Sequence, residues 1–354
     1  MVACARVYAA SRFNTHRPLT RRRSEAINLS DATSARTAGT EYRGLLLALL
    51  VACAFAVNSA FARLAYEAGS NALTVLTVRT LTALLVLTLL LRVVGVSATL
   101  PRKRAFGALA LGLLMASYSY GLLGSIQYVP LAVGLVTFYT YPLLTALISA
   151  ALGRERLQPL TLVALVVAFC GLALVLDLGG NLTDPVGIAH ALGASVCFTA
   201  LLLLSDTVRG GGDSRPITLH MLVTTLLVYV LACAVTGAFT LPTTTLGWIG
   251  LLGCPVLYSF AIITLFEAVS AAGPVRAALM LNLEPVFSAS LGYALLDQLL
   301  NGWQVVGMAL VVGAVVSARL PAVLGSRWHA LDRIAAFALI SGLILVLAAL
   351  SVLP

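Results

Sequence analysis

Residues 129–157, VPLAVGLVTFYTYPLLTALISAALGRERL, and residues 273–300, GPVRAALMLNLEPVFSASLGYALLDQLL, follow one pattern twice. In each copy a proline, Pro142 or Pro285, interrupts an apolar run of helical length, and a polar turn follows. Aligning the two prolines offsets the copies by 143 residues and sets Tyr141 opposite Glu284. An internal duplication of this size predicts a fold built from two related halves.

The composition indicates a membrane protein. Of the 354 residues, 60% are hydrophobic and 10% are charged, and the mean hydropathy is +1.01. Apolar windows of about 20 residues are long enough to cross the hydrocarbon layer as helices, whereas the alternating strands typical of a barrel are not evident. We therefore predict an all-α integral membrane protein. The predicted spans are residues 45–64, 72–92, 106–124, 131–151, 160–178, 186–205, 217–238, 247–268, 274–294, 303–320 and 334–353.

The basic residues predict how the chain is oriented. With the N-terminus in the cytoplasm, 20 of the 22 Lys and Arg residues lie on the cytoplasmic side, and the exceptions are Arg63 and Arg79. Short cytoplasmic loops retain Lys and Arg, so this sorting favours the cytoplasmic N-terminus. The net charge of +9 follows from the same sorting and indicates a membrane rather than a nucleic acid partner.

The orientation also relates the two copies to each other. The turn after the first copy falls inside and the turn after the second falls outside. Because five spans per half is an odd number, the second half must cross the membrane in the opposite direction. Inverted repeats of this kind are typical of transporters that work by alternating access.

A resemblance to a known family rests on the broken helices. Tyr141, Pro142 and the GRERL turn in the first copy, with Glu284, Pro285 and the glycines at 307–313 in the second, resemble the EamA-type permeases of the drug/metabolite transporter superfamily. The resemblance implies a ten-helix 5+5 fold with repeats at 44–178 and 186–320 around a central cavity. It also implies export or exchange of small solutes such as amino acids, metabolites or drugs.

The two ends of the chain extend beyond the resemblance. Residues 1–43 are basic, and we expect a disordered cytoplasmic tail, although its first part also resembles an organelle transit peptide. Residues 334–353 carry no charge and predict an eleventh span. We expect that span to be an accessory anchor. The alternatives are a lateral gate or an oligomer contact, and the second of these would allow the protein to form a homodimer.

Glu284 is the leading candidate for a functional residue because it is ionisable and lies near the middle of a predicted span. Such groups are costly in lipid and usually have a partner or a purpose. It could bind a cationic group, carry a proton, or lock the helix break through a hydrogen bond. Burial disfavours the charged form of a carboxyl group, so proton coupling is chemically feasible.

Arg79, in the outer half of the second span, is the other charged candidate. Its side chain could snorkel to the membrane surface, since it lies close to the end of the span. The alternatives are an ion pair with Glu284 or a bidentate interaction with a solute carboxylate.

Aromatic and amide side chains complete the candidate site. They would give a cavity an apolar body with a few directed hydrogen bonds, and interhelical hydrogen bonding is their alternative role. Tyr141 and Asn282 rank highest because each lies within one turn of a repeat proline, where freed carbonyls can face a solute. The set is Tyr118, Tyr139, Tyr141, Tyr258, Asn58 and Asn282.

These features favour a secondary transporter in the cell (inner or plasma) membrane. The sequence has no P-loop, so the chain cannot itself hydrolyse ATP and must use a gradient or equilibrate its solute. No nucleophile with a base and no metal cluster is evident, which argues against an enzyme, and we expect no cofactor or metal. The expected partners are a small solute, the lipid bilayer and protons. A membrane-embedded sensor or scaffold without transport activity is the alternative function.

Overall fold

The computed structural model describes residues 19–125, 128–129, 131–154, 158–176, 184–296 and 301–317. Every regular element in these ranges is an α-helix, which confirms the all-α membrane prediction. The predicted eleventh span at 334–353 lies outside the described residues.

The helices match the sequence-based spans closely. One helix, or two helices separated by a break, occupies each of the predicted spans between residues 45 and 320. Seven described segments are long and apolar enough to cross a membrane, and the apolar helices α6 and α12 are shorter. The bounds are α1 Leu19–Glu67, α2 Ala72–Val94, α3 Arg102–Ser125, α4 Leu131–Phe138, α5 Tyr141–Ala151, α6 Pro159–Val175, α7 Pro185–Arg209, α8 Ser214–Thr236, α9 Thr245–Ala272, α10 Pro274–Leu281, α11 Leu283–Leu296 and α12 Gly302–Ser317.

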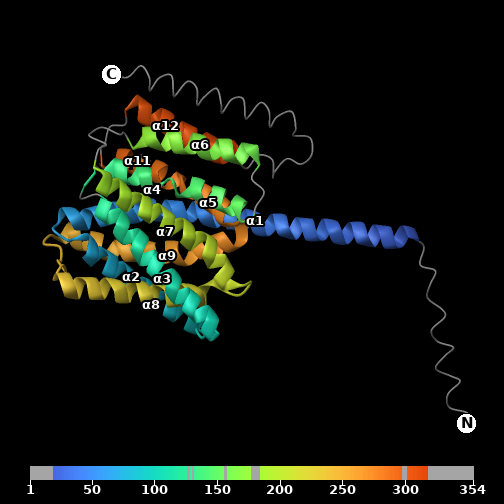
Figure 1. Ribbon diagram of the computed structural model, residues 1–354, viewed down its shortest axis with the longest axis horizontal. Helices are drawn as coiled ribbons and strands as arrows, with labels where there is room; N and C mark the ends of the chain where they lie inside the picture. Colours follow the sequence, from blue (N-terminus) through green and yellow to red (C-terminus); the bar gives the residue numbers. More distant parts are fainter. Residues whose placement is uncertain are drawn as a thin grey trace, which may run out of the picture.

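The first helix is longer than predicted. It begins at Leu19, so residues 19–43, which we expected to be disordered, continue the first membrane helix and project from the bundle (Figure 1). No proline interrupts these residues, and several are Ala, Arg or Glu, which favour helix. The helical hydrogen-bond ladder therefore continues past the apolar span.

The helices of the two halves, α1–α6 and α7–α12, pack in matching ways. In the two halves α1 corresponds to α7, α2 to α8 and α3 to α9. The contact of α1 with α9 has its counterpart in the contact of α7 with α3, and the contact of α2 with α9 has its counterpart in that of α8 with α3. In addition α2 contacts α8, and α6 contacts α12 along one side of the bundle (Figure 1). Contacts that repeat when the halves are exchanged are those expected from two halves related by a two-fold axis.

The pair α6 and α12 shows how the halves run relative to each other. Gln304, near the start of α12, donates from Nε2 to the carbonyl of Val175 at the end of α6 over 3.2 Å. Farther along, a Cβ on Gly307 would lie 2.5 Å from the carbonyl oxygen of Gly171, and one on Gly171 would lie 2.8 Å from that of Gly307. The two helices are therefore antiparallel. Since they are the last helices of the two halves, this supports the predicted inversion.

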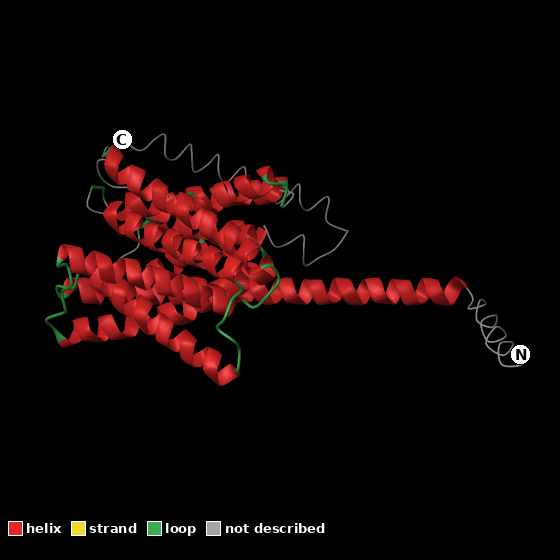
Figure 2. Cartoon of the chain, turned by 60° about the horizontal axis from the view of Figure 1, so that its bottom comes forward, coloured by secondary structure: helices red, strands yellow, loops and turns green. Residues whose placement is uncertain are grey.

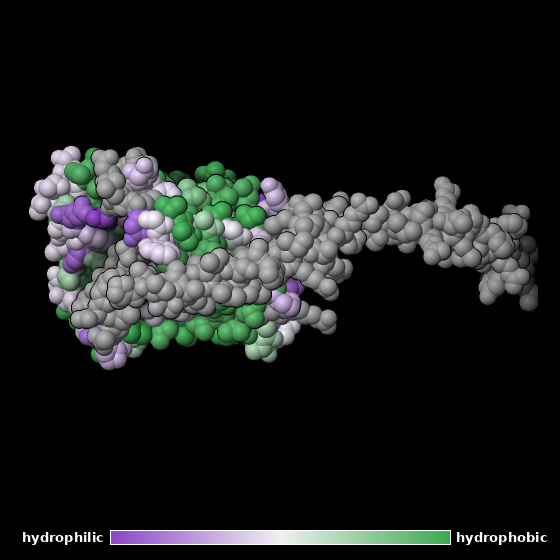
Figure 3. All heavy atoms as spheres, turned by 90° about the horizontal axis from the view of Figure 1, so that it is seen from above, coloured by the Kyte–Doolittle hydropathy of each residue, from purple (hydrophilic) through white to green (hydrophobic). Residues whose placement is uncertain are grey.

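The outer surface of the bundle is apolar between its ends. The loops gather at the two ends of the bundle (Figure 2), and hydrophobic residues cover the flank between them (Figure 3). A surface of this kind is costly in water and is suited to lipid chains. Among the exposed residues are Leu85, Leu89, Leu227, Leu231, Leu252 and Val256.

Candidate functional site

Both helix breaks lie where the duplicated prolines predicted them. α4 ends at Phe138 and α10 ends at Leu281, in each case four residues before a buried proline, Pro142 or Pro285. Proline has no N–H to donate, and its ring crowds the carbonyl four residues earlier. The carbonyls of Phe138 and Leu281 therefore lack their usual helical donor at corresponding depths of the two halves.

Side chains from the two breaks meet. The hydroxyl of Tyr139, between α4 and α5, lies close to the carboxyl group of Glu284 at the start of α11. Tyr141 is also an electrostatic neighbour of Glu284. Tyr139, Tyr141 and Asn282 are all buried, with at most 4% of the residue exposed, whereas Glu284 is partly buried. The residues that the sequence ranked highest thus lie at the breaks, and Tyr139 and Glu284 lie close to each other across the halves.

Aromatic rings from α3, α4, α5 and α7 pack beside the first break. The ring of Phe198 lies 4.7 Å from that of Tyr118 and 4.7 Å from that of Tyr141, measured between centroids. Phe138 contacts the same rings. The sequence-based selection favoured tyrosines for their hydroxyl groups and so missed Phe138 and Phe198. Their position in apolar spans gave no signal that distinguishes them from lipid-facing residues.

Arg79 points into the bundle. Its guanidinium carbon lies 4.3 Å from the ring centroid of Tyr258, which is in the middle of α9, so the side chain does not snorkel outward. Among the described residues it donates no hydrogen bond and forms no ion pair, and its buried Nε has no partner. The direct ion pair with Glu284 that we considered is therefore absent there. Glu284 and Arg79 influence each other only as separated charges.

Two further groups lie near Arg79. Cys254 on α9 donates from Sγ to the side-chain oxygen of Asn58 on α1 over 2.9 Å, which joins these two helices beside the guanidinium. The buried Tyr229 on α8 is an electrostatic neighbour of Arg79 and was missed in the sequence. Its presence at mid-depth in a predicted span was the same signal that selected Tyr258. Asn58 thus has a structural hydrogen bond, while Tyr258 and Tyr229 face the charge.

The helical bundle, the broken helices and the unpaired polar groups define a multi-pass membrane transporter. The sequence profile of the EamA-like transporter family matches residues 42–177 and 185–320, one domain in each half. The chain therefore belongs to the EamA-like transporter family, within the drug/metabolite transporter superfamily, whose members are transporters and not enzymes.

A comparison with solved structures agrees on the fold. A structure titled "Crystal structure of protein" aligns over 80% of this chain and 98% of its own, with a TM-score of 0.66 and 19% sequence identity. At that identity the likeness concerns the fold alone. No protein among those with curated functions matches this sequence.

Proposed function

We propose that the protein is a secondary transporter that moves small metabolites, such as amino acids or related compounds, out of the cell by alternating access. The observation that carries this proposal is the packing of the two broken helices against each other, α5 against α10, which places Tyr139 of one half near Glu284 of the other. In transporters built from inverted repeats, solute and coupling ion bind near the midplane where such broken helices meet.

A cavity at one end of the bundle supports alternating access. It has a volume of about 380 Å³ and lies between the ends of α5 and α7 and the turn from α9 to α10. We assign this end to the cytoplasm because its loops carry many of the basic residues. The lining residues are Ser149, Arg154, Leu203, Asp206, Thr207, Gly273 and Pro274.

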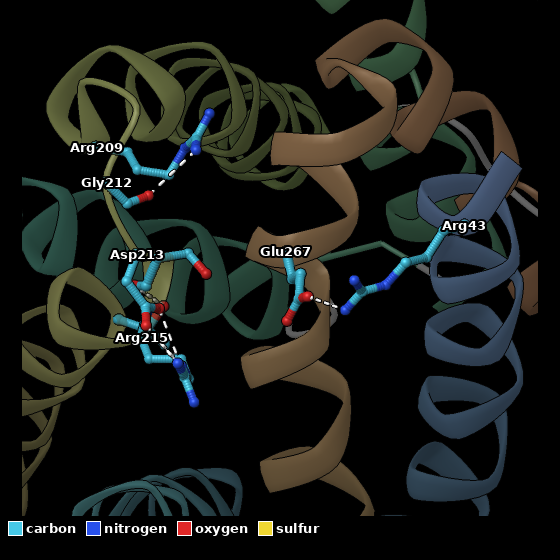
Figure 4. Close-up of polar contacts among 8 residues, drawn as sticks. Arg43, Arg209, Gly212, Asp213, Arg215 and Glu267 are labelled. Atoms are coloured by element: carbon cyan, nitrogen blue, oxygen red, sulfur yellow. Dashed lines mark hydrogen bonds and ion pairs between the residues drawn. The ribbon is translucent and has the colours of Figure 1, made fainter. Parts of the chain in front are cut away.

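Ion pairs lie at the same end. Arg43 on α1 pairs with Glu267 on α9 over 2.5 Å, and Asp213 pairs with Arg215 at the start of α8 (Figure 4). Arg209, at the end of α7, also donates to the carbonyl of Gly212 over 3.2 Å. These contacts hold helices together at the end of the bundle where the cavity lies.

Hydrogen bonds join the halves at the opposite end. Asn71 donates from Nδ2 to the carbonyl of Ala238 over 2.8 Å, and the N–H of Thr240 donates to Oγ1 of Thr74 over 2.8 Å. We call these four residues the outer clasp. A cavity between the halves at the cytoplasmic end, with the clasp formed at the other, is the arrangement expected of an inward-facing state.

Glu284 is the proposed coupling residue, and transport by purified protein in liposomes tests this role. We expect saturable counterflow of at least one compound from a broad metabolite panel, with uptake that depends on pH. Glu284→Gln should remove most of that pH dependence because the amide cannot exchange a proton. Glu67→Gln, which changes an exposed carboxylate on α1, is the matched control and should behave like the wild type.

The possible results separate the parts of the proposal. Absence of saturable movement for every compound in the panel would refute the transporter proposal. Full pH dependence in Glu284→Gln would leave transport in place and show that another group carries the proton.

A further inference from the structure

We propose that Arg79 binds a carboxylate of the transported solute, so that the substrates of this transporter are carboxylates. This inference rests on the proposed transport function and concerns the same site. It starts from the state of the guanidinium, which lies inside the bundle with no anion in contact among the described residues. A buried charge is costly unless it is paired and hydrogen-bonded.

Other arginines of the described chain have the partners that Arg79 lacks. Arg43, Arg63, Arg209 and Arg215 each pair with a carboxylate of the protein near a helix end. These pairs are close to water, where their contribution is small. Arg79 lies instead against Tyr258 in the middle of α9, away from the helix ends, and has more to gain from an anion, because electrostatic interactions strengthen as the surroundings become less polar.

The groups packed around Arg79 are uncharged, and Glu284 interacts with it only as a separated charge. The guanidinium carbon lies over the ring of Tyr258, and the other electrostatic neighbours are Tyr66, Tyr118, Tyr229 and Cys254. An aromatic face stabilises a cation but accepts no strong hydrogen bonds from its N–H groups. The five donors of the guanidinium therefore remain available for a ligand.

Unused hydroxyl groups lie beside the same charge. The hydroxyls of Tyr229 and Ser119 neighbour each other, and both are buried without a hydrogen-bond partner among the described residues. Buried polar atoms without a partner are rare and call for an explanation such as a bound ligand or water. A carboxylate would accept two parallel hydrogen bonds from the guanidinium and others from these hydroxyls. A phosphate dianion would bring more negative charge than one arginine neutralises.

Glu284 does not occupy the position beside Arg79 that we propose for the solute carboxylate. Tyr118 interacts electrostatically with both Arg79 and Glu284, so the phenol lies near both charges, which form no direct pair. The carboxylate of a solute can therefore bind Arg79 while Glu284 remains free for a proton or for a cationic group of the solute. Arg79 would then bind the solute carboxylate, and Glu284 would bind the proton or the cationic group of the solute, within one transport cycle.

Ligand-induced thermal stabilisation of the purified, full-length protein in detergent tests the inference without relying on transport. The probes are the common amino acids and, for each, its carboxamide and its decarboxylated amine; leucine, leucinamide and 3-methylbutylamine form one such set. We expect one or more of the acids to stabilise the wild type while their two matched derivatives do not. For those acids, Arg79→Gln should weaken binding on the order of 30-fold or more, since one partner of a buried charge pair is lost.

Two further variants separate binding from folding. Arg79→Lys keeps the positive charge but not the planar fork, so it should also lose most carboxylate affinity, whereas a merely structural cation would tolerate lysine. Arg63→Gln removes an exposed arginine predicted on the same side of the membrane and should bind like the wild type.

Each outcome decides the question. If no acid stabilises the wild type, if the carboxamides and amines bind as well as the acids, or if Arg79→Lys keeps full affinity, the inference is wrong. Counterflow of neutral or cationic solutes by the same protein would then leave the transport proposal standing. Failure of all counterflow would refute transport instead, whatever the acids bind.

Discussion

Tyr258 is the residue that holds the guanidinium of Arg79 in place. Its ring lies against the charge at 4.3 Å, and the residue is almost fully buried. A cation on an aromatic face in a dry site is stabilised by about 0.5–2 kcal/mol. Tyr258→Phe should keep this stabilisation, and Tyr258→Leu should lose it. The melting temperature in detergent is the measurement.

The matched control for Tyr258 is Tyr120 on α3, which is 55% exposed on the outside of the bundle. Tyr120→Leu should leave the melting temperature nearly unchanged. Equal destabilisation by Tyr258→Phe and Tyr258→Leu would show that the hydroxyl group, and not the ring, matters at this position.

Asp213 makes the stability of the start of α8 depend on pH. The hydrogen bond from the side chain of Arg215 lowers the pKa of Asp213 below its usual value, and Asp213 also accepts from the backbone N–H of Arg215. A carboxyl group with a lowered folded-state pKa stabilises the fold above its unfolded pKa, and this stabilisation disappears as the pH falls through the folded value. We expect the wild type to lose stability below about pH 4.

Asp213→Asn tests this dependence because the amide can still cap the helix but does not titrate. The variant should be less stable than the wild type at pH 7, and the difference should shrink as the pH is lowered. Thermal unfolding measured from pH 7 to pH 3 checks both statements. Parallel loss of stability in the two proteins would assign the acid sensitivity to other groups.

At the scale of helices, the sequence predicted where elements occur better than which way they face. The prolines predicted both breaks, and the apolar windows predicted the spans up to residue 320. However, Tyr118 and Tyr120 are two residues apart in an apolar helix, and one is 8% exposed while the other is 55% exposed. A helix between lipid and protein is apolar all round, so periodicity does not identify its inner face.

The contacts of the site were the least predictable part. Glu284 and Arg79 stood out because ionisable groups are rare at depth in a membrane. That Tyr139 meets Glu284, and that Tyr258 meets Arg79, follows from the packing of helices distant in the sequence. Phe198 was missed for the same reason, since no local pattern connects it with the first break, whereas Tyr229 carried the mid-span signal of Tyr258 and was overlooked.

The crossing of α6 and α12 depends on glycine at one position. A Cβ on Gly307 would come within 2.5 Å of the carbonyl oxygen of Gly171, so Gly307→Ala must push the helices apart. Overpacking of this kind costs about 1–3 kcal/mol. The melting temperature should fall accordingly. Gly313→Ala in the same helix is the control, because its Cβ would meet no atom of the described residues within 4 Å and should leave stability unchanged.

For the whole molecule, the outer clasp should set the balance between inward- and outward-facing states. Asn71→Ala removes the hydrogen bond to Ala238 between the halves, together with the side-chain cap at the start of α2, and a hydrogen bond contributes about 1 kcal/mol. The outward-facing population should then rise about fivefold. Cys233 on α8, whose sulfur lies 3.5 Å from Oγ1 of Thr77 on α2, is a native reporter of the separation of these helices.

The measurement is the rate at which an impermeant thiol reagent, added from the outside, labels Cys233 when the other cysteines are replaced. The rate should rise with the outward-facing population in Asn71→Ala. Thr88→Ala removes only a hydrogen bond within α2, away from the clasp, and is the control. An unchanged rate in Asn71→Ala would mean that the clasp does not hold the outer end closed.

The pairing of α1 with α9 constrains how the protein can be made. α1 leaves the ribosome first, yet the helix that packs against Gly44 and Asn58 belongs to the second half of the chain. The last helix of the first half, α6, likewise receives its partner only with α12. The first half therefore cannot complete its packing until the second half has been made. We expect the inserted helices of the first half to remain incompletely packed in the bilayer until α9 and α12 are inserted.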